Sequence, residues 1–161
     1  MPETLSVIAP QFVEMAHNIG VAVAASVDRH GRPHTRVMQP VWTFDGESLS
    51  GVVSTVTTSP KVAHLRRAPN LSLTYWAPNQ NTCSAECDVV FVTDDADRAA
   101  AWNLFLTTPP PAGFDPAHYP DWTSSASPTF GVFRLSPTWL RVMPGTLMTS
   151  GEGSVSTWRR R

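Results

Sequence analysis

Lys61 is the only lysine in a chain that contains eleven arginines, and it directly follows the dipeptide Ser59-Pro60. Serine is favoured just before a helix and proline at the first helical position, so the sequence predicts a helix over residues 60–67 with Lys61 in its first turn. A first turn exposes unpaired backbone N–H groups and the positive end of the helix dipole. A hydroxyl and an ammonium group at such a place indicate an anion site, and phosphate is the common occupant; an ordinary capped surface helix is the alternative.

The composition limits the possible partners. At 161 residues the chain fits one domain with a sizeable core. Its formal charge of −1 and its pI near 6.5 provide no basic field for nucleic acid, and the three arginines at the end indicate a tail. The start lacks a basic leader, and the longest apolar run, residues 21–25, is too short for a membrane. We therefore expect a soluble, cytoplasmic protein that binds neither nucleic acid nor membranes.

Strand-like alternation dominates the chain. Apolar residues alternate with polar ones in several short runs bounded by turn residues, which is typical of antiparallel strands. The expected elements are helices over residues 10–18, 60–67 and about 95–106 and strands over residues 21–27, 34–44, 48–54, 71–76, 83–93, 129–135 and 138–143. This pattern predicts a mainly β fold, a six- to seven-stranded antiparallel barrel with short flanking helices, with an α+β sandwich as the alternative.

Two remaining segments and two cysteines complete the expected organisation. Residues 107–128 contain six prolines but also several aromatic residues, so we expect an ordered loop that acts as a lid or contacts a partner, with His118 or Tyr119 able to close a pocket. Residues 1–145 would form the domain and residues 146–161 a flexible tail. Cys83 and Cys87 are four apart on an expected strand, about 13 Å, which is too far for a disulfide.

An ordered set of motifs carries a family resemblance. The segments are Arg36-Val-Met-Gln-Pro-Val-Trp, a Phe-Asp-Gly turn, Ser54-Thr-Val-Thr-Thr-Ser-Pro-Lys and Arg66-Arg-Ala-Pro-Asn-Leu-Ser-Leu-Thr-Tyr-Trp. In this order they resemble the flavin-binding split-barrel superfamily, whose named example is pyridoxamine 5′-phosphate oxidase, with the general stress protein branch the nearer match. The resemblance runs from about residue 20 to residue 143. It implies a split barrel and a homodimer with flavin mononucleotide (FMN) at the subunit interface, touched by both chains.

The resemblance also implies roles for individual residues. Arg36 and Lys61 would pair with the flavin phosphate, and Ser59 would hydrogen-bond it. The residues expected along the flavin ring are Val37, Met38 and Gln39 on one strand and Ser54, Thr55 and Val56 on the facing strand. Thr82 stands where the oxidase has a cofactor-contacting glutamine, and Arg141 is the last candidate for the cofactor site.

General chemistry supports phosphate binding by Arg36 and Lys61 independently of the resemblance. A guanidinium suits bidentate recognition of an anion, and an ammonium adds a compact charge. Departures from the oxidase are also visible: Pro60 replaces a basic residue, Cys87 replaces a strand glycine, and the oxidase's substrate-binding ending is not reproduced around Arg141. Trp42 is the tryptophan that we expect beside the pocket. The five histidines show no metal-ligand spacing, so no metal site is expected.

Two classes of function follow from these residues. The first is an FMN-dependent oxidoreductase acting on an unidentified small substrate, because a flavin carries the redox chemistry and needs no catalytic triad from the protein. The second is a flavin-binding or stress-related module without turnover. A third possibility keeps the barrel but changes the cofactor to a deazaflavin, whose longer tail would need an extended basic groove, or to haem, with His64 as a candidate axial ligand.

Overall fold

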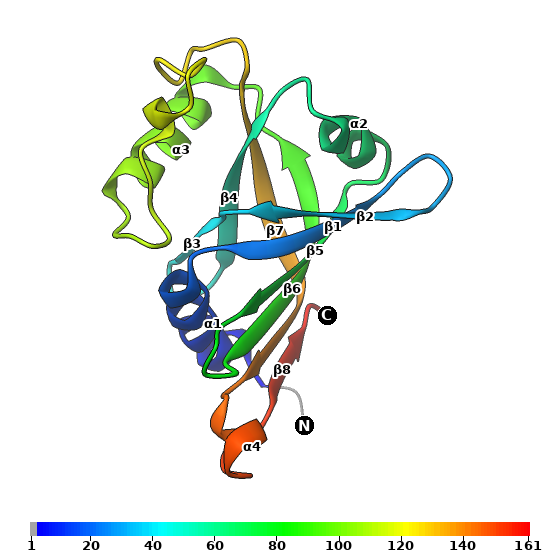
Figure 1. Cartoon of the computed structure of the whole chain (residues 1–161), viewed down its shortest axis with the longest axis vertical. Helices are drawn as coiled ribbons and strands as arrows, with labels where there is room; N and C mark the ends of the chain where they lie inside the picture. The colour runs from blue at the N-terminus through cyan, green and yellow to red at the C-terminus, as the bar shows by residue number, and fades with distance from the viewer. Residues whose placement is uncertain (1–2) are drawn as a thin grey trace.

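The computed structural model describes residues 3–161 (Figure 1). Its elements, in chain order, are α1 (Leu5–Ile19), β1 (Ala22–Val27), β2 (Pro33–Met38), β3 (Val41–Phe44), β4 (Leu49–Val56), α2 (Pro60–Arg67), β5 (Asn70–Trp76), β6 (Thr82–Phe91), α3 (Asp95–Thr107), the short 3-10 helix η1 (Pro116–His118), β7 (Phe130–Met143), α4 (Thr146–Thr149) and β8 (Ser156–Arg159). The fold is mainly β with short flanking helices, as the sequence predicts.

One antiparallel sheet forms the body of the molecule. Its strands follow the order β2-β1-β5-β6-β7-β4-β3, and β8 adds to β7. The sheet has eight strands, where the sequence predicted six or seven. It curls into a split barrel, with α1 against one half and α2 and α3 beside the other half (Figure 1). Strands β2 and β3 are the two ends of the sheet order and are joined only by Gln39 and Pro40.

Three boundaries differ from the sequence prediction. Helix α1 begins at Leu5, so Pro10 lies inside the helix and not at its start. The expected strand over residues 34–44 is divided into β2 and β3 by Pro40. The two strands expected around Pro137 form one strand, β7, because the register shifts opposite Glu86 and Cys87 and so accommodates a residue that has no N–H to donate.

Residues 146–161 do not match the expected flexible tail. They contain α4 and β8, and β8 pairs with β7 in the register Leu140 to Trp158. Trp158 packs against the hydrophobic core that contains Phe12 and Trp42, and Arg160 forms an ion pair with Asp88 on β6. The segment is therefore part of the barrel wall, because it supplies both backbone partners and an apolar side chain.

Two hydrophobic cores share the sheet. The larger core lies between α1 and the inner face of the sheet, where the ring of Phe12 meets the ring of Trp42 edge-on at a centroid distance of 5.0 Å. The smaller core lies under α3 and the loop after it, and it contains Phe105, Trp122 and Phe130. The loop over residues 107–128 is therefore ordered by packing, as expected; its role as a lid stays a prediction.

The cysteines occupy the inner face of β6. Cys83 and Cys87 are both buried and unpaired, as the strand spacing predicts. Burial in the apolar core raises the pKa of the Cys83 thiol to about 12 and also raises the pKa of Cys87.

No helix among residues 3–161 has the length and apolarity needed to cross a membrane.

Candidate anion and cofactor site

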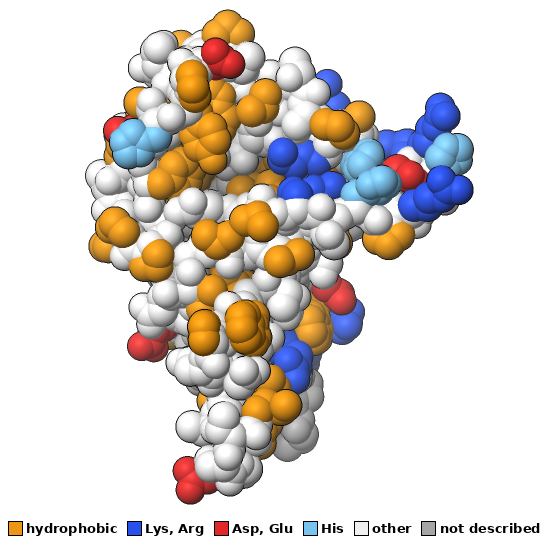
Figure 2. Space-filling model, viewed as in Figure 1, with side chains coloured by type: hydrophobic (Ala, Val, Ile, Leu, Met, Phe, Trp, Pro, Cys, Tyr) orange, Lys and Arg blue, Asp and Glu red, His pale blue; other side chains and the backbone are white. Residues whose placement is uncertain are grey.

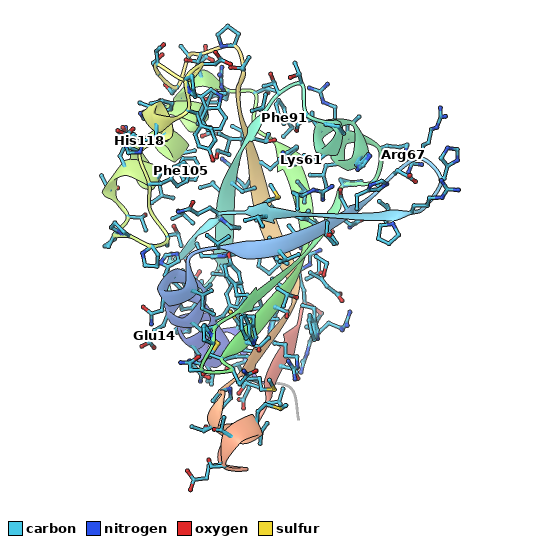
Figure 3. The ribbon with its side chains drawn as sticks, viewed as in Figure 1. Glu14, Lys61, Arg67, Phe91, Phe105 and His118 are labelled. Atoms are coloured by element: carbon cyan, nitrogen blue, oxygen red, sulfur yellow. The ribbon has the colours of Figure 1, made fainter. Side chains whose placement is uncertain are left out.

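The site is organised by the N-terminal end of α2 and the strand that faces it. Residues 60–67 form the predicted helix, with Ser59 as the residue before it and Pro60 in the first position. The hydroxyl of Ser59 does not cap the helix; it lies 3.2 Å from the hydroxyl of Thr55 at the end of β4. Strand β4 therefore leads directly into the helix start and holds Lys61 beside the barrel (Figure 3).

Arg36 reaches the same place from β2. It pairs with Ala24 of β1 in the register and shares the inward face of the hairpin with buried Met38. Its guanidinium Nη1 donates to the hydroxyl of Ser26 at 2.8 Å and to the carbonyl of Ala24 at 3.4 Å. Ser26 is itself buried, so the guanidinium is fixed by groups of the barrel wall and not by a carboxylate.

The two cations stand together without an acidic partner. Burial lowers the pKa of Lys61, and the positive charge of Arg36 lowers it further. Burial also lowers the pKa of Arg36. Among residues 3–161 the ion pairs join other side chains, and none involves Arg36 or Lys61. Two partly buried like charges are unfavourable unless an anion joins them, so this arrangement fits a phosphate dianion.

Histidines extend the basic face beyond this pair. His64, one turn after Lys61 on α2, lies with Nδ1 3.3 Å from the hydroxyl of Ser26. The ring of His34, two residues before Arg36 on β2, lies 5.1 Å from the ring of His64. Figure 2 shows lysine, arginine and histidine side chains gathered over α2 and the outer end of the β1–β2 hairpin.

The hairpin turn ends the basic face with a carboxylate. Asp28 accepts hydrogen bonds from the backbone N–H groups of His30 and Arg32 and from His34 Nε2 at 3.1 Å. The bond from the Arg32 N–H is the main cause that lowers the pKa of Asp28 to about 2, followed by the bond from His34. Arg67, in the last turn of α2, donates to the Asp28 carbonyl, so the helix and the hairpin are tied together at this end.

The residues expected along the flavin ring alternate between the two faces of β2. Val37 is 67% exposed on the outward face of β2, whereas the side chain of Met38 is buried. The amide of Gln39 donates to the carbonyls of Pro111 and Ala112 and so joins β2 to the long loop.

The facing strand shows the same alternation. Thr55 is buried beside Ser59, Val56 is exposed, and Ser54 is partly buried on the outward face of β4. On these strands only alternate residues can therefore share a surface with Arg36 and Lys61.

Trp42, which we expect beside the pocket, lies in the core of the barrel. It is 2% exposed, its indole N–H donates to the hydroxyl of Tyr75 at 2.9 Å, and its backbone N–H donates to His17 Nε2. The indole therefore has a structural partner inside the barrel. Sequence spacing alone could not separate this role from a role beside a cofactor, because the pairing with Tyr75 joins strands 33 residues apart.

Thr82 and Arg141 do not join the Arg36–Lys61 cluster within one chain. Thr82 begins β6, and Arg141 is on β7 opposite Ser84. In the sheet order, β7 is four strands away from β2, which carries Arg36.

A cavity among the described residues lies away from this cluster. It has a volume of about 680 Å³ and is bounded by one face of α1, the turn between β5 and β6, and the C-terminal segment. Glu14 of α1 lies on its wall (Figure 3). Among residues 3–161, no three side chains of the metal-ligating types are grouped so that they could hold a metal ion.

Sequence reasoning missed Ser26 and the pairing of the two histidines. Their signal was present in the spacing: His34 and Arg36 are two apart on a strand, and Lys61 and His64 are three apart on a helix, so each pair shares a face. The sequence could not show that these two faces oppose each other, because that depends on how α2 packs on β1.

The family match follows the same segments. The family model described as pyridoxamine 5′-phosphate oxidase matches residues 8–143. The chain belongs to this family. The match spans every strand from β1 to β7 and both sides of the Arg36–Lys61 cluster.

Solved structures agree with the fold. A protein from Clostridium acetobutylicum related to general stress protein 26 has a TM-score of 0.67 at 14% identity, over 99% of this chain and 96% of that one. A pyridoxamine 5′-phosphate oxidase-related, FMN-binding protein from Nostoc punctiforme has a TM-score of 0.63 at 14% identity, over 100% and 99%. A heme-binding protein from Mycobacterium smegmatis has a TM-score of 0.62 at 16% identity, over 99% and 59%. No curated protein matches the chain at a significant level.

Proposed function

We propose that this protein binds FMN through its phosphate at Arg36 and Lys61 and acts as an FMN-dependent oxidoreductase on a small substrate. The observation that carries the proposal is the pair of partly buried cations, held by Ser26 and by the start of α2, to which residues 3–161 offer no paired carboxylate. Membership of the family and the FMN-binding neighbour from Nostoc punctiforme support the choice of FMN among phosphate-bearing ligands.

The protein's own groups have distinct tasks in this proposal. Arg36 supplies a planar fork for two phosphate oxygens, Lys61 supplies a point charge, and the backbone N–H groups at the start of α2 supply further donors. Ser59 stands beside them, with its hydroxyl turned toward Thr55. When bound, the flavin would supply the redox chemistry, and the barrel would hold and orient it.

We further propose that the working unit is a homodimer. On the outward face of the sheet, Val37 pairs with Val23, which pairs with Thr74, and the two valines are 67% and 53% exposed. Such an apolar strip on two neighbouring strands favours contact with a second copy. The family resemblance implies an interface flavin that both copies contact, so we propose that Thr82 and Arg141 reach it from the second copy.

The first experiment identifies the cofactor and then tests turnover. Purified protein, or apoprotein reconstituted with FMN, is expected to show the flavin absorption bands, and mass spectrometry of the released ligand names it. Stopped-flow reduction by excess reduced nicotinamide then separates an enzyme from a binding module, because a module without turnover would reduce slowly or not at all. Failure of apoprotein to bind added FMN would contradict the proposal.

Haem is the second candidate ligand, since one structural neighbour binds heme and His64 lies at the same surface. In this chain Nδ1 of His64 faces Ser26, which leaves Nε2 for an axial bond. A Soret band that disappears in His64→Ala would favour haem. The Arg36–Lys61 pair, which has no carboxylate partner among residues 3–161, favours the phosphate of a flavin instead.

The cytoplasmic location expected from the sequence stays a prediction.

A further inference from the structure

Ser26 is a buried polar side chain on the inward face of β1. It is 3% exposed, and the residues that share this face, Ala22 and Ala24, are buried and apolar. A buried hydroxyl is unfavourable unless it is hydrogen-bonded, so its partners indicate its role. These partners are the guanidinium of Arg36 on β2 and the ring of His64 on α2. Ser26 therefore links the two elements that flank the proposed phosphate site.

The chemistry of the three groups sets the direction of their hydrogen bonds. A guanidinium can only donate, so Oγ of Ser26 accepts from Nη1 of Arg36 at 2.8 Å. The hydroxyl proton of Ser26 then needs an acceptor, and Nδ1 of His64 lies 3.3 Å from the same oxygen. Nδ1 can accept only in the neutral ring that carries its hydrogen on Nε2. The chain of hydrogen bonds thus runs from Arg36 through Ser26 to His64.

The same bonds determine which edge of the Arg36 guanidinium remains free. Within residues 3–161, the hydrogen bonds of this side chain all come from Nη1, which donates to Ser26 and, at 3.4 Å, to the carbonyl of Ala24. The remaining donors of the guanidinium are on Nε and Nη2. These two nitrogens present parallel N–H groups, the fork that recognises two oxygens of one phosphate.

We propose that Ser26 is a positioning residue for the cofactor phosphate. It holds Nη1 of Arg36 against β1, so that the Nε–Nη2 edge is set before the phosphate binds, and it fixes His64 in the tautomer with hydrogen on Nε2. This inference rests on the proposed FMN site at Arg36 and Lys61. The tautomer also bears on haem as the second candidate ligand, because an Nε2 that carries hydrogen has no lone pair for iron.

The benefit of Ser26 lies in the order that it gives to Arg36 in the apoprotein. Arginine has many rotamers, and ordering one such side chain on binding weakens affinity by about 2- to 12-fold. Among residues 3–161, no ion pair holds Arg36 in place. The hydroxyl of Ser26 and the carbonyl of Ala24 supply that order instead.

The first test measures FMN and riboflavin binding to Ser26→Ala by quenching of flavin fluorescence. FMN should bind about 2- to 12-fold more weakly, whereas riboflavin, which has no phosphate, should bind as before. In the Arg36→Ala background, Ser26→Ala should change FMN affinity by less than about twofold, because no guanidinium is left to position. A full additional loss in that background would overturn the proposal.

Ser127→Ala is the matched control for a lost buried hydroxyl. Ser127 is 6% exposed, and its hydroxyl accepts from the backbone N–H groups of Thr123 and Ser124 in the long loop. Both serine variants should lower thermal stability, because each leaves buried donors without an acceptor. Only Ser26→Ala should weaken FMN. Equal weakening by Ser127→Ala would reduce the effect of Ser26 to one of general stability and refute its positioning role.

The second test examines the ring of His64 in the original protein without a ligand. Long-range proton–nitrogen correlation spectra distinguish the two neutral tautomers of histidine, and His64→Gln assigns the signals. At about pH 9, above the range in which histidine ordinarily changes charge, His64 should carry its hydrogen on Nε2. In Ser26→Ala the ring should show a mixture of tautomers. Hydrogen on Nδ1 in the original protein would contradict the direction of the hydrogen-bond chain.

Arg36→Lys tests the assignment of the free edge. Lysine retains the charge, but its single nitrogen cannot hold the barrel wall and also present two parallel donors. FMN should therefore bind this variant at least about threefold more weakly, with riboflavin affinity unchanged. Unchanged FMN affinity would show that the fork of Nε and Nη2 is not used.

Failure of this inference and failure of the proposed function are distinguishable. If Arg36→Ala/Lys61→Ala binds FMN as the original protein does, the proposed phosphate site itself fails. If that double variant loses FMN but Ser26→Ala binds FMN as Ser127→Ala does, only the positioning role of Ser26 fails.

Discussion

The clearest consequence of the Arg36–Lys61 pair is a selective loss of FMN binding in Lys61→Met. Methionine retains an apolar stem that packs where the lysine stem does, but it removes the charge. One charge-assisted hydrogen bond to phosphate contributes about 1.5–3 kcal/mol, so FMN should bind about 10- to 150-fold more weakly. Riboflavin, which lacks the phosphate, should bind the variant as it binds the original protein.

The assay is quenching of flavin fluorescence, with FMN and riboflavin titrated in parallel. Arg66→Met is the matched control, because it removes one positive charge from the same helix at a site where the guanidinium lies over the ring of Phe91 at 5.0 Å. The control should leave FMN affinity nearly unchanged. The double variant Arg36→Ala/Lys61→Ala should lose FMN altogether while it remains folded.

A second measurement checks the same reasoning without a ligand. In the apoprotein, burial and the charge of Arg36 both disfavour the charged form of Lys61. Removing this charge should therefore leave the thermal stability of the apoprotein unchanged or raise it. Equal weakening of FMN and riboflavin in Lys61→Met, or a marked loss of apoprotein stability, would show that Lys61 supports the fold and not the phosphate.

Three other predictions concern the barrel itself. Tyr75→Phe removes the acceptor of the buried Trp42 indole N–H and should lower the free energy of unfolding by about 1–3 kcal/mol, measured by urea titration. Cys83 and Cys87, buried and with raised pKa values, should not react with a thiol reagent at pH 8 until the protein is unfolded. The pKa of Asp45 is lowered to about 2, chiefly by backbone N–H groups of its own turn. The contribution of Asp45 to stability is therefore complete above about pH 4 and is lost as the pH falls toward 2. In an acid titration followed by circular dichroism, Asp45→Asn should lose less stability over that range than the original protein.

Local signals predicted the helices more reliably than the strand ends. The dipeptide Ser59-Pro60 fixed the start of α2, and Pro69 fixed its end, because both effects act within a few residues. The same kind of signal misplaced the start of α1, where Pro10 is accommodated inside the helix. A favourable first position for proline does not exclude an earlier start when buried residues such as Ile8 and Ala9 precede it.

Features that depend on distant pairing could not be predicted from the sequence. Strand β8 looks like a polar tail by composition, and it becomes a strand only because β7 offers it a partner. The core position of Trp42 depends on Tyr75, and the fixed position of Arg36 depends on Ser26. The helix start at Ser59-Pro60 pointed to Lys61 and the family resemblance added Arg36, whereas their closeness required the packing of α2 against β1.

Strand β7 has a consequence for how the molecule comes apart. Its residues Phe130 and Val132 belong to the smaller core, and Phe133 and Leu135 belong to the larger one, so successive side chains serve opposite faces of a single strand. A slip of one position would empty both cores at once. Because both cores depend on this one strand, we expect them to unfold together in a single transition.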